Sequence, residues 1–138
     1  MAGTVIGTMG AGAYVGFNSL NTYAVSSRLY SEAQTAAQNQ IDLILSVEPF
    51  DVTNNNIPSA LALGTTTTPN IFIYEDPVSG SVVVTGTMTT TITDTGSTMN
   101  FAGTTANLNI RRATVTVSYT YRNTNYSVSM DTMRTADR

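Results

Sequence analysis

The sequence predicts an α+β protein in which a long N-terminal α-helix packs on one face of an antiparallel β-sheet. Two observations carry this prediction. Residues 1–48 can form one helix, which ends before Pro49 because proline cannot continue the helical hydrogen-bond ladder. Residues 70–134 contain segments that alternate apolar side chains with threonine or serine, separated by turn residues. Alternation with a period of two is typical of strands that bury one face.

The predicted helix divides the chain into a stalk and a head. We expect a stalk helix at residues 1–48, with residues 1–22 as its hydrophobic assembly or membrane part. Residues 49–138 are then a β-rich head that packs on residues 23–47. No charged side chain precedes Arg28. A continuous helix of this length would extend ~70 Å, far more than a small head domain needs.

The first part of the helix is rich in glycine. Gly3 and Gly7, like Gly12 and Gly16, form small-xxx-small pairs that allow a second helix to approach closely. For the isolated segment in water, fraying is the competing interpretation, because each glycine costs ~1 kcal/mol relative to alanine. The side chains predicted to make apolar contacts in an assembly are Val5, Ile6, Met9, Val15 and Phe17.

The second part of the helix carries two apolar stripes. The first, predicted to face the sheet, is Tyr23, Ser26, Tyr30, Ala33, Ala37, Ile41 and Ile44. The second, about 100° away around the helix, is Val25, Leu29, Ala36 and Leu43. The second stripe has two interpretations, the edge of the core or a contact with another subunit. Base rates favour the core edge, but in a filament subunit we expect the contact.

Turn residues and β-formers divide the rest of the chain. The prediction is a loop at residues 50–70, strands at 70–75 and 81–94, turns at 76–80 and 95–97, and an irregular segment at 100–106. Gly86, inside the second strand, is predicted to mark a β-bulge.

Residues 109–134 give the clearest β-hairpin. With Asn123 and Thr124 as a two-residue turn, the predicted pairs are Tyr121 with Tyr126, Tyr119 with Val128, and Val117 with Met130. Because this turn lacks the usual glycine, a four-residue loop is the alternative. All these residues share one face, which we expect to pack on the first helix stripe. Threonine and serine side chains form the opposite, solvent-exposed face.

Composition leaves little material for catalysis. The chain has no Cys and no His, which rules out Ser/His/Asp and Cys/His arrangements. Glu75 and Asp76 are adjacent, so their side chains diverge and do not form a paired-carboxylate site. The net charge is −3 and the only adjacent basic pair is Arg111 and Arg112, so nothing indicates nucleic acid. We therefore expect no enzyme activity, no cofactor and no nucleic-acid partner.

Two loops offer oxygen ligands for calcium. Asp51 precedes the asparagines at 54–56, and Asp94 precedes Ser97. Neither provides a full ligand set, and turn formation explains both. We therefore predict no metal site.

The layout of the chain resembles that of type IV pilins and pseudopilins, in particular the minor pilins. The resemblance is carried by an apolar-then-amphipathic helix, by Arg28, Leu29, Tyr30, Ala33 and residues 38–42, and by the hairpin residues 111–121 and 126–134. It implies a structural subunit of a type IV pilus or of a type II-secretion-like pseudopilus. Its partners would be other pilin subunits, and the inner membrane before assembly. The assembled filament would be extracellular or periplasmic.

The resemblance also carries an expectation about the N-terminus. The family has a basic leader, a glycine before the cleavage point and an acidic residue in the apolar run, and none of these occurs here. The resemblance therefore implies an N-terminally truncated sequence. The alternative function is an adhesin, or a surface or phage fibre domain, that binds without catalysis. A fibre is expected to show internal repeats, and the sequence has none.

Overall fold

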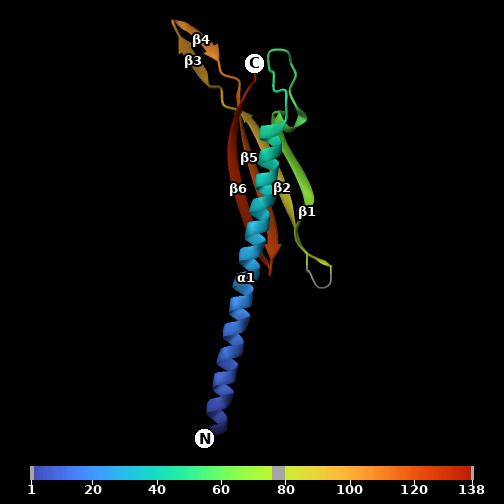
Figure 1. Cartoon of the computed structure of the whole chain (residues 1–138), viewed down its shortest axis with the longest axis vertical. Helices are drawn as coiled ribbons and strands as arrows, with labels where there is room; N and C mark the ends of the chain where they lie inside the picture. The colour runs from blue at the N-terminus through green and yellow to red at the C-terminus, as the bar shows by residue number, and fades with distance from the viewer. Residues whose placement is uncertain (1, 76–79, 138) are drawn as a thin grey trace.

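The structure is a computed structural model that describes residues 2–75 and 80–137 (Figure 1). One long helix, α1 (Ala2–Ser46), is followed by a β-rich head that begins with a short 3₁₀ turn. The elements of the head are η1 (Ser59–Leu61), β1 (Gly64–Glu75), β2 (Val82–Asp94), β3 (Thr98–Phe101), β4 (Thr104–Asn107), β5 (Ile110–Tyr121) and β6 (Thr124–Thr135). The α+β prediction is confirmed, and most of the predicted turn at residues 76–80 lies outside the described residues.

The main sheet has four strands in the order β1-β2-β5-β6. Each strand is antiparallel to its neighbours, so the sheet is a meander interrupted by the separate β3–β4 hairpin. The C-terminal half of α1 lies along one face of this sheet, and the N-terminal half extends well beyond it (Figure 1). Contacts of the helix with the sheet are concentrated on β5 and β6.

The core lies between α1 and the sheet. On the helix side, Ala33 and Ala37 are fully buried, and such small side chains permit a close approach to the strands. On the sheet side, the core contains Val84, Ile92, Val115, Val117 and Val128. The first predicted stripe is therefore confirmed from Ala33 to Ile44, whereas Tyr23 and Tyr30 at its start are exposed.

The predicted subunit contact of the second helix stripe is wrong in part. Leu29 is fully buried in the core, and Val25 and Ala36 pack half-buried against it. These three residues therefore form the edge of the protein's own core, and a subunit contact is wrong for Leu29. The physical reason is that a helix on a sheet buries an arc wider than one stripe. Only Leu43, which is 49% exposed, points away from the core.

Strand β1 begins earlier than predicted. Residues 65–68, expected in a loop, pair with residues 88–91 of β2, because runs of β-branched threonine suit a pleated strand. The register shifts after Thr68, at Pro69 and Asn70, and Asn70 has a positive φ of 57°. Proline has no N–H to donate to a ladder, so it is tolerated at such an irregularity. The bulge therefore lies in β1 and not at Gly86.

Gly86 is required for a different reason. It pairs regularly with Tyr119 of β5. A Cβ atom at Gly86 would lie 2.8 Å from the carbonyl oxygen of Ser118 and 3.1 Å from Cγ1 of Ile73. Glycine at this position thus allows close packing inside the sheet.

The turn of the β5–β6 hairpin differs from the prediction, and the β3–β4 hairpin was not predicted. The β5–β6 turn is formed by Arg122 and Asn123, with φ values of 49° and 60°. The predicted turn would place the β-branched Thr124 at a positive φ, which is unfavourable. The observed pairs, such as Val117 with Val128, differ from the predicted ones by two residues, so the apolar face is unchanged. Residues 100–106, expected to be irregular, form the β3–β4 hairpin around Ala102 and Gly103.

Candidate functional site

A buried arginine fixes the C-terminal end of α1. Arg134 of β6 is 8% exposed, and its Nη1 donates a hydrogen bond to the carbonyl oxygen of Ile44 at 2.9 Å. A positive charge at a helix C-terminus is favourable, because the last carbonyl groups lack helical partners. Arg134 also forms an ion pair with Asp137, at 3.3 Å between Nη2 and Oδ2. The Asp137 carboxylate accepts a further bond from the backbone N–H of Phe50 at 2.7 Å.

A second buried arginine holds the connection that follows the helix. Arg111 of β5 lies directly opposite Arg134 in the strand register. Its Nη1 donates a hydrogen bond to the carbonyl oxygen of Leu61, and its guanidinium lies 5.2 Å from the ring centroid of Phe50. Neither arginine was assigned a role from the sequence. The available signal was their parity, because each occupies an alternate position that apolar residues use elsewhere in its strand.

The opposite end of the sheet determines where the helix leaves the head. At the tip of the β5–β6 hairpin, Nη1 of Arg122 donates a hydrogen bond to Oγ1 of Thr22 at 2.9 Å. On the N-terminal side of this contact, α1 continues outside the sheet (Figure 1). We call residues 23–46 of α1 the packed segment and residues 2–22 the projecting segment.

The projecting segment exposes apolar side chains. Phe17 is 75% exposed and Leu20 is 66% exposed, and Tyr23, at the start of the packed segment, is 74% exposed. A Cβ atom added at Gly16 would meet no neighbour within 4 Å. Residues 2–22 contain no charged side chain. Neighbouring exposed apolar side chains on a helix are typical of an interaction site.

The predicted assembly residues all lie on this segment. Gly16 and Phe17 are exposed, as an intermolecular contact requires. The others lie in the helix, but their side chains are outside what the structure describes: Gly3, Val5, Ile6, Gly7, Met9, Gly12 and Val15. Within the described part of the chain, no helix combines the length and the apolar character needed to cross a bilayer. Leu20 and Tyr23 were not singled out from the sequence for this surface, although they share the uncharged stretch before Arg28.

Tyrosines gather where the helix leaves the sheet. The rings of Tyr119 and Tyr126 stack with centroids 5.4 Å apart and an interplanar angle of 16°. Burial raises the pKa of Tyr119, and the neighbouring Tyr126 and Tyr30 raise this pKa further. Tyr119 is only 5% exposed, so its ring is part of the core and not of a binding platform.

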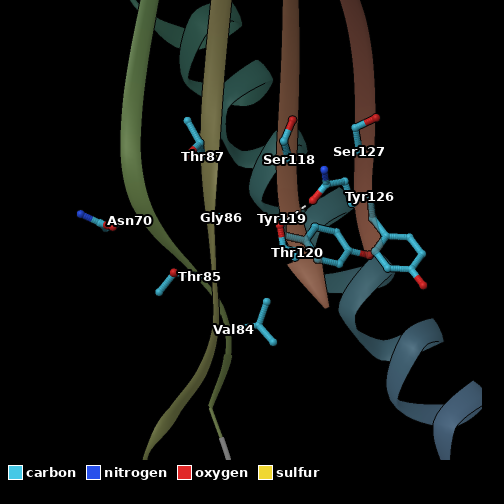
Figure 2. A pocket seen from close by; sticks show the side chains of 11 residues that line it. Asn70, Val84, Thr85, Gly86, Thr87, Ser118, Tyr119, Thr120, Tyr126 and Ser127 are labelled. Atoms are coloured by element: carbon cyan, nitrogen blue, oxygen red, sulfur yellow. Dashed lines mark hydrogen bonds between the residues drawn. The ribbon is translucent and has the colours of Figure 1, made fainter. Parts of the chain in front are cut away.

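A hollow of about 760 Å³ opens at this end of the sheet (Figure 2). Figure 2 shows Thr87, Ser118 and Ser127 on three neighbouring strands. Oγ1 of Thr120 donates a hydrogen bond to Oδ1 of Asn125 at 2.7 Å. Every side chain that lines the hollow is uncharged: Asn70, Val84, Thr85, Gly86, Thr87, Ser118, Tyr119, Thr120, Asn125, Tyr126 and Ser127. The hydroxyl groups have no base among these residues to activate them as nucleophiles.

The two loops considered for calcium use their carboxylates within turns. Oδ1 of Asp51 accepts a hydrogen bond from the backbone N–H of Asn54 at 3.1 Å, and Oδ2 accepts one from Nδ2 of Asn54 at 2.6 Å. Oδ1 of Asp94 accepts a bond from the N–H of Gly96 at 2.9 Å. Among the described residues, no three carboxylates come together in a group that could hold a metal ion.

Comparisons of the chain with protein-family models, with curated proteins and with solved structures found no match. Function is therefore inferred from the residues themselves. Among the described residues, the candidate surface is the uncharged projecting segment, on which Phe17 and Leu20 are exposed.

Proposed function

We propose that this protein is a structural subunit that assembles into a pilin-like filament through the projecting segment of α1. The single observation that carries the proposal is a helix that continues beyond its own sheet without charge and with Phe17 and Leu20 exposed. Water-exposed apolar surface of this kind becomes favourable when a second helix covers it.

The glycine spacing supports the same proposal. A helix with glycines at positions 12 and 16 has no side chains along that line, so a neighbouring backbone can come close. The glycines weaken the isolated helix, and packing against other helices compensates for this cost. The segment is thus poorly suited to an isolated subunit and well suited to a bundle of helices.

The proposal assigns the filament to a type IV pilus or a type II-secretion-like pseudopilus. Before assembly the same segment associates with the inner membrane, and afterwards it lies in the interior of an extracellular or periplasmic filament. The sheet and its hydroxyl-bearing face remain on the outside. These finer assignments rest on the resemblance in layout and on the chemistry of the projecting segment.

The test compares two charge-introducing substitutions in the full chain. Phe17→Asp places a carboxylate on the projecting segment, where Phe17 makes little contact with the head. Asn39→Asp is the matched control, because Asn39 is exposed on the solvent side of the packed segment. We expect Phe17→Asp to abolish concentration-dependent assembly in light scattering and electron microscopy, whereas Asn39→Asp assembles like the parent.

Both variants should keep the parent's melting temperature, since surface substitutions change stability by less than ~0.5 kcal/mol. A shorter chain beginning at Asn21 provides a second measurement and should be a folded monomer. Normal filaments from the Phe17→Asp variant would refute assembly through the helix. Unfolding of the shorter chain would instead show that residues 2–20 belong to the core.

A further inference from the structure

The main sheet ends in two strands that each pair on one side only. Among the described residues, β1 pairs with β2 alone and β6 pairs with β5 alone. An edge strand presents a row of unpaired backbone N–H and C=O groups that can bind another strand. Soluble proteins usually protect such edges with proline, lysine, bulges or very short strands.

Strand β6 lacks these four protections, and its only charged residues are Asp131 and the buried Arg134. Its twelve residues pair with β5 without any shift in register, and they contain neither proline nor lysine. Strand β1 is partly protected, because Pro69 and Asn70 interrupt its register. The register shifts again between Phe72 and Tyr74 and between Tyr74 and Glu75. The regular stretch that remains on the outer edge of β1 is therefore residues 64–68.

The hydrogen-bond pattern shows which groups of β6 are free. In an antiparallel ladder, the N–H groups of alternate residues point toward the partner strand. Directly after β6, the N–H of Ala136 donates to the carbonyl oxygen of Asn109, which precedes β5, at 2.8 Å. Even-numbered residues of β6 therefore direct their N–H groups toward β5. Odd-numbered residues such as Ser127 and Ser129 direct their N–H groups outward. The side chains of these two serines are exposed on the face away from α1.

Strand direction decides which edges can meet in a filament. Four strands that alternate in direction leave β1 and β6 antiparallel to each other. If two copies stand side by side with their helices pointing the same way, β6 of one copy comes next to β1 of the other in antiparallel orientation. Pairing β6 with β6 in antiparallel orientation would instead require the two helices to point in opposite directions. A filament in which every projecting segment has the same direction excludes that second arrangement.

Charge does not oppose this contact. Glu75, at the end of β1, is the only charged residue in that strand. Strand β6 contains two, the exposed Asp131 and the buried Arg134. The regular stretch of β1 at residues 64–68 is almost entirely threonine, and residues 126–130 of β6 are serine, tyrosine and apolar side chains. These residues are well suited to cross-strand pairs.

We propose that the free edge of β6 in one copy pairs with the free edge of β1 in the next, and so extends the sheet from subunit to subunit. The proposal rests on the proposed filament, because it takes the common direction of the helices from it. Rotation about an axis parallel to α1 then places the helices inside and a wall of connected sheets outside. Such a contact joins two different surfaces, and it gives an open filament when each rotation is combined with a rise along the axis, so that no ring closes.

The test removes one outward N–H group without changing the side-chain chemistry of the core. Ser129→Pro deletes the donor at an edge position where proline is tolerated, and Ser129→Ala keeps the donor and loses only the hydroxyl group. In the full chain, we expect Ser129→Pro to remain folded by circular dichroism and to lose filament formation. Ser129→Ala is expected to assemble like the parent.

Amide hydrogen exchange of the parent gives a readout that needs no substitution. The amides of Ser127 and Ser129 should exchange rapidly in the monomer and slowly in the filament. This measurement also decides the case if Ser129→Pro fails to fold. Rapid exchange of both amides in the filament would overturn the proposal, as would normal assembly of a folded Ser129→Pro variant.

Cross-linking identifies which strand of another copy pairs with the outer edge of β6. The chain has no cysteine, so engineered thiols are the only ones present. Mixed disulfides between a Ser129→Cys chain and a Thr65→Cys or Thr67→Cys chain are expected in the filament. If the Ser129→Cys chain links only to itself, β6 pairs with β6 and the proposal is wrong.

The helix contact and the edge contact between β6 and β1 can be refuted separately. If Phe17→Asp blocks assembly and Ser129→Pro does not, assembly through the helix stands and the edge contact is refuted. If Ser129→Pro blocks assembly and Phe17→Asp does not, the edge contact stands and the helix-based function is refuted.

Discussion

The two segments of α1 have the same secondary structure and different sources of stability. The packed segment buries Leu29, Ala33, Ala37 and Ile44 completely against the sheet. The projecting segment exposes Phe17 and has no such support among the described side chains. Tertiary burial therefore stabilises one segment, whereas the other continues as a helix from a turn that is already formed.

The length of the β5–β6 hairpin determines where one segment gives way to the other. Each of its strands has twelve residues, which corresponds to about 40 Å. Residues 23–46 of the helix extend over about 36 Å, nearly the same length. The hydrogen bond from Arg122 to Thr22 lies where the two lengths end together. Any helical residue before this point has no sheet to pack on.

A matched pair of substitutions tests this comparison with the largest expected effect. Leu29→Ala removes a fully buried side chain and should destabilise the fold by about 2–5 kcal/mol, because it leaves a cavity. Leu20→Ala makes the same chemical change at a position that is 66% exposed and should cost less than ~0.5 kcal/mol. Urea unfolding monitored by circular dichroism measures both. Equal losses would mean that the projecting segment is also part of the folded core.

A second pair tests the attachment at the other end of the packed segment. Arg134→Met keeps an apolar stem but leaves the buried carbonyl of Ile44 without its donor, which should cost about 1–3 kcal/mol. Arg112→Met removes an arginine whose ion pair with Asp131 lies on the exposed face, and should shift the urea midpoint much less. If Arg112→Met proves the more damaging change, the buried arginine does not fix the helix end.

The sequence was sufficient to predict the parts of the fold in which pattern and burial coincide. The helix, the strand at residues 81–94, the C-terminal hairpin and the apolar face of that hairpin were all predicted from periodicity. The apolar pattern of β5 and β6 tolerates a two-residue slip, so periodicity alone could not determine the register. The conformational preference of Thr124 in the turn contained that information, because it disfavours a positive φ.

Other features depend on contacts that no local pattern encodes. The threonines at 65–68 form a strand only because β2 lies beside them, and local turn signals hide this pairing. Arg111 and Arg134 were assigned no role because arginine is mostly exposed in proteins, and only the folded chain brings them to carbonyl groups. The lack of charge in residues 2–22 was enough to predict an interaction segment. The length of the sheet determined which of its side chains stay exposed.

Acidification should lower the stability of the head and leave the projecting segment unchanged, and this is the smallest effect predicted. The hydrogen bond from the Thr114 hydroxyl, followed by that from Arg112, lowers the pKa of the Asp131 carboxyl. The pKa is lower in the folded protein than in the unfolded chain, so the ionised carboxylate contributes stability above the unfolded value. That contribution disappears as the pH falls through the lowered pKa of the folded state. Residues 2–22 contain no Asp or Glu and therefore bind no side-chain protons in this range.

The measurement follows the urea midpoint of the parent and of Asp131→Asn from neutral to acidic pH. We expect the parent to be slightly more stable at neutral pH, and the difference to close as Asp131 becomes protonated. Exposure of both partners and screening by water keep this difference small. Amide exchange of the projecting segment, corrected for the intrinsic effect of pH, should be the same in both proteins throughout. A difference between them in that segment would show that Asp131 is coupled to the helix, and would contradict the independence of the two segments.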